Sequence, residues 1–403
     1  MGRNLVEVSV MRCNFVLLLA AIATPLIIVD VADAELAPGI YNIGTLNNQW
    51  GVPRSWPRAL TPDGSIAVGG STTNYPWTSE AFVWQSGTLT GLGDAPGNTD
   101  YPYDEPFSVA HDLSPDGRYV VGSATWDYGT SPAIWVDGEG PYDINILTSD
   151  SHGGVAMATS ANLTIVGQKN VGQGNQAFVW GGNLSGLGDL PGGEFESIAN
   201  DITPDASVIV GTGHSEAGQE AFVYKNGMMT GLGDLPGGNF GSRANAVSAD
   251  GSTIVGWGTS GTSIYAEASI WRDGVITGLG DLPGAEADSQ ALAVSGDGSV
   301  VVGLGISNQG CGSCGSAFIW DDTNGMRFLD DVLTEDYGID LDGWFLEVAT
   351  AISDDGQTIA GIGYNSNDRS YATAFVVRLP EPGTLSFVTI VAMVVFKRRT
   401  GLR

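Results

Sequence analysis

The chain has 403 residues, of which 59 are glycine and 15% are charged. Its 45 acidic and 16 basic side chains give a formal net charge of −29 at pH 7. Nucleic acids and anionic lipid headgroups bind to basic surfaces, so this charge excludes DNA- and RNA-binding proteins and favours cationic or neutral partners.

The N-terminus has the pattern of a signal peptide over residues 1–34. Two arginines precede an apolar run from Phe15 to Val29, and Ala32 and Ala34 then form the small-x-small pattern of a signal-peptidase site. Cleavage there starts the mature chain at Glu35. A retained membrane anchor is the alternative, but the run is short and its exit is polar.

Residues 35–379 repeat one phrase seven times. Each copy has a small residue, an Asp-Gly-type turn, a β-branched run that ends in glycine, a variable loop and a variant of Ala-Phe-Val-Trp. The glycines that end these runs are Gly69, Gly122, Gly167, Gly211, Gly256, Gly303 and Gly361. A period of about 45 residues with several short strands is typical of propeller blades.

Each repeat contains four expected strands: Ala-x-x-aliphatic, β-branched-Val-Gly, Ala-Phe-Val-Trp and Met/Leu-x-Gly-Leu-Gly. The seventh repeat ends at Val377 without the fourth strand, and a strand of that type stands alone at Tyr41–Leu46. We therefore predict an all-β, seven-bladed β-propeller of four-stranded antiparallel blades, closed by the N-terminal strand so that no edge is exposed.

The last segment, residues 380–403, has the pattern of a short membrane-sorting tail. Its apolar stretch from Thr384 to Phe396 would form a transmembrane helix of about 20 Å, shorter than the roughly 30 Å hydrocarbon core. A turn-forming motif precedes this stretch, and a basic stop-transfer cluster follows it. The motif is Pro380, Glu381 and Pro382, and the cluster is Lys397, Arg398 and Arg399.

This tail resembles the PEP-CTERM signal of bacteria that make extracellular polysaccharide. The resemblance implies transient membrane anchoring, recognition of the motif by an exosortase-type sorting protease, and release to the cell envelope or extracellular matrix. The repeats themselves resemble the HAF family of extracellular repeats, although Glu80, Gln176, Glu220 or Ser316 stands where that family has His. The HAF family has no established activity, so the resemblance bears on location rather than on chemistry.

The alternation of strands sorts the connections between the two faces of the propeller. One face receives the short Asp-Gly hairpins, and the other receives the Asp-Leu-Pro-Gly turns and the variable insertions. Binding sites usually lie in long loops on a rigid scaffold, so we expect function on this variable-loop face. Aromatic rings beside carboxylates there suit a sugar-binding surface, with packing between loops as the alternative. The candidate residues are Tyr75, Trp77, Tyr101, Tyr103, Trp126 and Tyr128.

The remaining acidic and cysteine motifs have structural interpretations. The recurrent Asp94, Asp189, Asp234 and Asp281 suit turns, and the alternative is a ring of carboxylates around the central opening. The acidic segment from Asp330 to Glu347 departs from EF-hand spacing, so solvated surface is favoured over a Ca²⁺ site. Its candidate calcium ligands are Asp336, Asp340 and Asp342. Cys311 and Cys314 favour a local disulfide in an oxidising envelope over a zinc or redox site.

No catalytic constellation stands out in the sequence. His111, His152 and His214 occupy unrelated repeat positions, and nucleophile-elbow and phosphate-loop motifs are missing. An enzyme on this scaffold needs inward-pointing His, Tyr, Arg or Glu side chains in one or two blades, and the repeats reveal no such set. We expect an exported, non-enzymatic and monomeric envelope or matrix protein that binds extracellular polysaccharide or another protein. The alternative is a polysaccharide-acting hydrolase or lyase.

Overall fold

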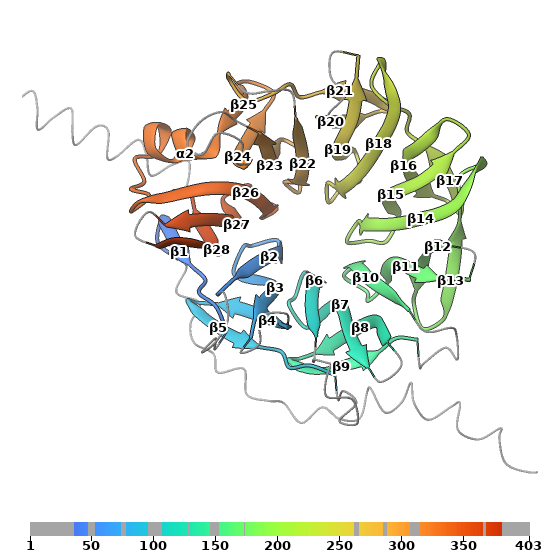
Figure 1. The fold of residues 1–403 in the computed structure, drawn as a ribbon, viewed down its shortest axis with the longest axis horizontal. Helices are drawn as coiled ribbons and strands as arrows, with labels where there is room; N and C mark the ends of the chain where they lie inside the picture. The colour runs from blue at the N-terminus through green and yellow to red at the C-terminus, as the bar shows by residue number, and fades with distance from the viewer. Residues whose placement is uncertain are drawn as a thin grey trace, which may run out of the picture. The chain divides into compact units, whose positions relative to one another are not determined.

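Seven four-stranded antiparallel sheets stand around a common axis in the computed structural model, as the repeats predict (Figure 1). The structure describes residues 36–46, 53–73, 78–95, 107–126, 129–145, 153–172, 174–261, 266–284, 288–306, 315–365 and 368–380. The predicted signal peptide, and the sorting tail beyond Pro380, lie outside these ranges. None of the helices in the described ranges is long and apolar enough to cross a membrane.

The first three blades follow one another along the chain. Blade 1 contains β2 (Ser55–Leu60), β3 (Ile66–Thr72), β4 (Ser79–Gln85) and β5 (Thr88–Gly91). Blade 2 contains β6 (Ser108–Leu113), β7 (Tyr119–Trp126), β8 (Gly129–Val136) and β9 (Glu139–Asp143). Blade 3 contains β10 (Gly154–Thr159), β11 (Ile165–Asn170), β12 (Asn175–Trp180) and β13 (Leu184–Gly188).

The next three blades repeat this order. Blade 4 contains β14 (Gly192–Ile202), β15 (Val208–Ser215), β16 (Gly218–Lys225) and β17 (Met228–Gly231). Blade 5 contains β18 (Gly237–Val247), β19 (Thr253–Ser260), β20 (Ala266–Arg272) and β21 (Val275–Gly278). Blade 6 contains β22 (Ser289–Val294), β23 (Val300–Ile306), β24 (Gly315–Asp321) and β25 (Gly325–Phe328).

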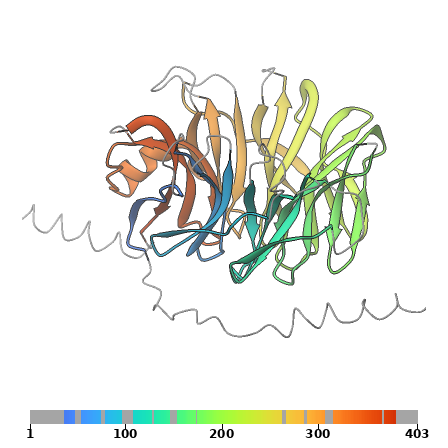
Figure 2. The same ribbon diagram turned by 60° about the horizontal axis from the view of Figure 1, so that its bottom comes forward.

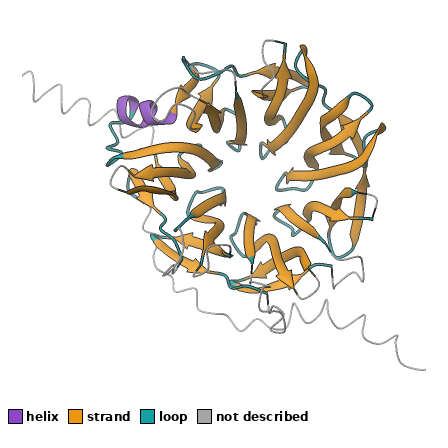
Figure 3. Ribbon diagram, in the orientation of Figure 1, coloured by secondary structure: helices purple, strands orange, loops and turns teal. Residues whose placement is uncertain are grey.

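Blade 7 is assembled from both ends of the propeller. It contains β26 (Trp344–Ile352), β27 (Thr358–Asn365), β28 (Asp368–Arg378) and the N-terminal strand β1 (Gly39–Asn42). The segments α2 (Leu329–Asp331) and η1 (Val332–Asp336) precede it at the rim (Figure 3). In every blade the first strand is innermost, and strands run between the two faces of the ring (Figure 2).

The N-terminal strand closes the ring, which confirms the prediction for this segment. β1 pairs antiparallel with β28, with Gly39 opposite Arg378 and Asn42 opposite Phe375. The Ile43 amide continues the ladder by donating to the carbonyl oxygen of Ala374 at 3.0 Å. Paired residues therefore begin two positions before the predicted Tyr41.

Residues 43–46 also make the contacts of a Gly-Leu-Gly segment. The Ser55 hydroxyl donates to the Gly44 carbonyl at 2.6 Å and accepts the amide of Ala374 at 3.0 Å. Ser108 makes the equivalent pair of bonds to Gly93 and Ala81 between blades 1 and 2. The chain ends are thus joined by the same interaction that joins consecutive blades.

Each Asp-Gly-type hairpin is held by a Ser or Thr hydroxyl that makes the same two hydrogen bonds in every blade. In blade 5 the Ser248 hydroxyl donates to Asp250 Oδ1 at 2.6 Å and accepts the Thr253 amide at 3.0 Å. The same pair of bonds occurs in all seven blades, with Asn162 replacing the acid in blade 3. The hairpin acids therefore serve the fold, as their turn sequences predict.

We expect Ile43→Ala to lower the free energy of unfolding by about 2–5 kcal/mol, because it leaves a cavity in the closure of the ring. Ile43 is 4% exposed and packs in the cluster that includes Phe82 and Ala374. Val275→Ala is the control on the outer strand β21, where the side chain is 64% exposed, and it should cost less than about 1 kcal/mol. Urea unfolding measures both, and equal losses would contradict the closure role of β1.

Candidate functional site in the central channel

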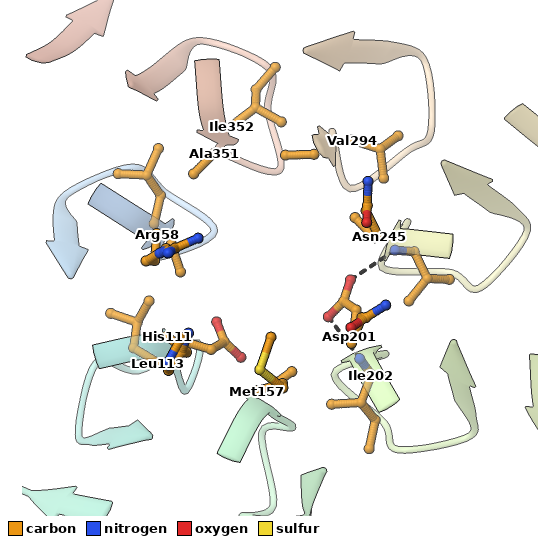
Figure 4. Close-up of a pocket in the computed structure, with 18 of the residues that line it drawn as sticks. Arg58, His111, Leu113, Met157, Asp201, Ile202, Asn245, Val294, Ala351 and Ile352 are labelled. Carbon is orange, nitrogen blue, oxygen red and sulfur yellow. Dashed lines mark hydrogen bonds between the residues drawn. The ribbon is translucent and has the colours of Figure 1, made fainter. Parts of the chain in front are cut away.

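A cavity of about 220 Å³ lies in the central channel and is lined by the inner strands of all seven blades (Figure 4). Its wall also includes residues of the Asp-Gly hairpins, such as Pro62, Pro115 and Pro204. The cavity therefore lies at the end of the channel where the inner strands turn into those hairpins. This is the face opposite the variable loops on which the sequence places function.

A β-bulge at one repeated position turns a side chain of each inner strand toward the channel. The register of every inner strand slips by one residue against its neighbour, between Ala110 and Asp112 in blade 2 for example. Bulges of this kind re-aim the extra residue. The seven bulge residues are Arg58, His111, Met157, Asn200, Asn245, Leu292 and Thr350.

The repeat glycines are explained by the same bulges. A Cβ added at Gly122 would overlap the carbonyl oxygen of Val109 in the adjacent inner strand, just before the bulge. The other six repeat glycines, which like Gly122 lie within the second strand of their blade, meet an inner-strand carbonyl in the same way. Any larger residue there would push the inner strand away. The bulged strand therefore requires a glycine at this position of the second strand.

Several bulge side chains join their blade to the next one. The Asn200 and Asn245 amides donate to the carbonyl oxygens of Ala244 and Ala291, at 2.7 and 2.8 Å. The Thr350 hydroxyl donates to the carbonyl of Pro57 at 2.9 Å and so links blade 7 to blade 1. These three polar residues are used by the scaffold.

Backbone bonds between neighbouring hairpins form a second set of links around the channel mouth. These bonds involve the residue just before the acid of each hairpin. Where this residue has an N–H, it donates to the carbonyl oxygen of the equivalent residue in the following blade. The donor–acceptor pairs are Ala161 with Pro204, Ala249 with Gly296, Gly296 with Asp354, and Asp354 with Pro62, at 2.9–3.1 Å. Pro62, Pro115 and Pro204 have no N–H to donate, so three seams lack this bond.

Two channel carboxylates bridge two of those three seams. The Asp112 carboxylate accepts the Thr159 amide of blade 3 at 2.8 Å. Asp201 accepts the amides of Val247 in blade 5 at 2.8 Å and Ile202 in its own strand at 2.7 Å (Figure 4). Five blades have alanine at the position of these acids, so Asp112 and Asp201 are specific to the seams that follow Pro115 and Pro204.

Both carboxyls are protonated more readily than an ordinary aspartate. Burial raises the pKa of Asp112 to about 7, against the opposing effect of its backbone hydrogen bonds. Burial also raises the pKa of Asp201 to about 7, and the charge of Asp112 adds to this effect. Near neutral pH the two carboxyls therefore share fewer than two negative charges.

The seam between blades 1 and 2 has none of these channel-side links among the described residues. Pro62 has no amide to donate, and Ala59 stands where Asp112 and Asp201 bridge the other proline seams. The bulge residues on its two sides are Arg58 and His111, which lie on the same side of the channel (Figure 4). Within the described ranges, the side chain of neither residue makes a hydrogen bond or an ion pair.

Arg58 exposes its side chain to the channel cavity, where the surrounding blades still desolvate part of it. Burial lowers the pKa of the Arg58 guanidinium, which still remains charged at neutral pH. Burial, and secondarily the charge of Arg58, lowers the pKa of His111 to about 4. At neutral pH the seam therefore presents one cation and one neutral imidazole.

The sequence-predicted sites have different positions. Trp126 lies half-buried at the end of β7, and the other five aromatic candidates lie outside the described residues, as do Cys311 and Cys314. The variable-loop face therefore stays a prediction. The four recurrent aspartates do not line the channel cavity; Asp234, for example, accepts the amides of Gly241 and Thr259 at 2.8 Å.

The calcium candidates have other partners. Asp336 Oδ2 lies 2.6 Å from Arg327 Nη1, and Asp340 Oδ1 accepts the Asp342 amide at 2.9 Å. In the part of the chain that the structure describes, no three potential metal ligands come together.

The chain matches no protein-family model and no curated protein. Solved structures share the fold at low identity. The β-propeller domain of the Trilobed protease from Pyrococcus furiosus, described as having an open velcro topology, has a TM-score of 0.52 and 10% identity over 82% of this chain and 96% of that chain. An oligogalacturonate lyase in complex with manganese has a TM-score of 0.52 and 13% identity over 87% and 95%. TolB from Acinetobacter baumannii is matched over 68% of this chain and 62% of its own, less than two thirds of its length, with a TM-score of 0.41 and 14% identity.

The repeats did not predict the polar side chains in the channel. The structure brings Arg58, His111, Asp112 and Asp201 to the channel, although the repeats had revealed no inward-pointing set. An alignment of the seven inner-strand phrases would have shown one position that varies freely after an alanine, which only Pro57 replaces. The sequence gives no reason to assign that position to the channel. The alternation of side chains between the two faces of a strand does not hold at a bulge.

We expect Asp201→Asn to weaken the pH dependence of stability between pH 5 and 8. The folded chain holds the Asp201 proton up to about pH 7, whereas the unfolded chain releases it near pH 4. This contribution to the free energy of unfolding is therefore present at low pH and is lost as the pH rises through 7. The wild-type melting temperature should fall over this range, and the fall should be smaller in the variant.

Asp205→Asn is the matched control in the same blade. Hydrogen bonds from the Ser207 amide and the Thr203 hydroxyl lower the pKa of Asp205 to about 2. Its contribution is therefore complete above pH 4 and is lost only at lower pH. Thermal unfolding at several pH values measures both variants, and an unchanged slope for Asp201→Asn would contradict the assignment.

Proposed function

We propose that the chain is an exported, non-enzymatic β-propeller of the cell envelope or extracellular matrix that binds glycan or protein. The observation that carries this proposal is that the repeated polar residues of the chain have structural roles, whereas the residues that depart from the repeat lie at other positions. Repeated serines, threonines and acids hold hairpins and seams. Residues that depart from the repeat line the channel, and in the sequence they also occur in the variable insertions. A rigid ring with variable loops is a common arrangement for binding.

The channel carboxylates favour binding over acid–base catalysis. Asp112 and Asp201 each accept a backbone amide from the next blade, which directs them into the seam. A catalytic pair would need free carboxyls on both sides of a substrate bond. Distant propellers include a lyase and the propeller domain of a protease, and a shared fold at such low identity does not transfer either activity.

We further propose that signal peptidase and an exosortase-type protease process the two ends of the chain. This rests on the signal-peptide pattern of residues 1–34 and on the resemblance of residues 380–403 to PEP-CTERM tails. Replacing Pro380, Glu381 and Pro382 by alanine should leave the protein in the membrane fraction of its native host. Mass spectrometry and fractionation give the result, and release of the variant at the wild-type rate would contradict the proposal.

The glycan proposal is tested with residues 35–379 on a glycan array, followed by Trp77→Ala and Trp126→Ala. Loss of one stacked ring should weaken sugar binding about 2- to 13-fold, because an aromatic contact contributes about 0.5–1.5 kcal/mol beyond its area. Met228→Ala is the control, since that side chain is 66% exposed on the outer strand β17. Binding unaffected by either tryptophan substitution would exclude the aromatic residues as the ligand surface.

A further inference from the structure

We propose that the central channel binds a small monocarboxylate, of the size of a single sugar acid, through Arg58 and His111 at the seam between blades 1 and 2. This site is separate from the variable-loop face, so it does not depend on whether that face binds glycan. It lies at the hairpin end of the channel, where the cavity is lined by both side chains (Figure 4).

The first argument is an unneutralised cation in a strongly acidic protein. The chain has 45 acidic side chains, yet the side chain of Arg58 forms no ion pair and no hydrogen bond with any described residue. Arg118 and Arg272, by contrast, pair with Asp137 and Asp322 at 3.1 and 2.9 Å on the surface. The guanidinium faces the channel cavity and is partly desolvated by the surrounding blades, so a bound anion would stabilise its charge.

The second argument is the structure of the seam. Among the described residues, three links that join other blades are missing at this seam. Pro62 has no hairpin amide to donate, Ala59 stands where an acid bridges other seams, and Arg58 stands where an amide or hydroxyl side chain joins other blades. The guanidinium donors of Arg58 and the ring of His111 therefore remain available to the cavity. No other seam has both of its bulge side chains titratable.

The charge and size of the cavity select the ligand. One guanidinium beside a neutral imidazole balances a single negative charge, and its planar donors match a carboxylate in a bidentate pair. Asp112, Asp201 and Asp354 line the same cavity and oppose any anion, and they repel a dianion such as phosphate more strongly than a monocarboxylate. At about 220 Å³, the cavity is smaller than the roughly 300–1,000 Å³ of a site for a drug-sized molecule, so one small molecule or one sugar unit fills it.

The rest of the wall suits an organic ligand. The part of the wall formed by blades 1 to 3, which includes the two donors, also contains the apolar side chains of Leu60, Leu113 and Met157. Apolar side chains can contact the carbon face of a sugar acid while Arg58 holds its carboxylate. A bare inorganic ion would gain nothing from them.

The experiment titrates the full-length protein, purified in detergent, with D-glucuronate by isothermal calorimetry. D-glucose is the neutral probe, acetate is the smallest carboxylate, and inorganic phosphate is the more highly charged anion. We expect saturable 1:1 binding of glucuronate, weaker binding of acetate, and none of glucose or phosphate at this site.

Arg58→Met tests the residue itself, and blade 3 has methionine at the equivalent position, so the ring accommodates this side chain. The variant should bind glucuronate about 10-fold more weakly or worse, because a hydrogen-bonded charge pair is lost. Arg58→Lys should fall between the two, since it keeps the charge without the planar donors. Thermal unfolding confirms that each variant is folded.

Arg118→Met is the matched control, because it removes one positive charge from the exposed end of blade 2, and its affinity should equal that of the wild type. Three results would overturn the proposal. They are a wild type that binds neither carboxylate, an Arg58→Met variant that binds as tightly as the wild type, and phosphate binding as tight as glucuronate binding.

Discussion

Close contact between a bulged inner strand and a glycine is the constraint on which the rest of the propeller depends. A side chain at Gly122 or at any of its six counterparts would overlap an inner-strand carbonyl, so only glycine lets the two strands pair beside the bulge. The bulge in turn directs one residue of each blade toward the axis. The scaffold thereby dedicates seven positions to the channel and leaves their chemistry free to vary.

Links between blades then decide which of those positions are free for a ligand. Hairpin amides, the amides of Asn200 and Asn245, and the carboxylates of Asp112 and Asp201 join six of the seven seams on the channel side. A proline at the hairpin removes the backbone amide that links other blades. At two seams a nearby aspartate restores a link by accepting an amide from the next blade. Only the seam after Pro62 has no such compensation among the described residues, and Arg58 and His111 border it.

Most of the fold could be predicted because each of its signals is local. The Asp-Gly turns, the four strands of each repeat and the closing strand near the N-terminus each correspond to a short stretch of chain. The structure confirms all three, with the closing strand at Gly39–Asn42 where the sequence predicts Tyr41–Leu46. The channel site could not be predicted in the same way. Arg58 and His111 are 53 residues apart, and a bulge breaks the alternation that would have assigned them to a face.

The number of blades, the strands in each, the closure by the N-terminal segment and the structural role of the hairpin acids can all be read from the repeats. These follow from periodicity and turn chemistry, which act over a few residues. Which side chains meet at the axis, which of them join blades, and that Arg58 has no partner among the described residues all depend on the three-dimensional arrangement. Those outcomes depend on seven inner strands converging from distant parts of the chain, and no local pattern records where they meet.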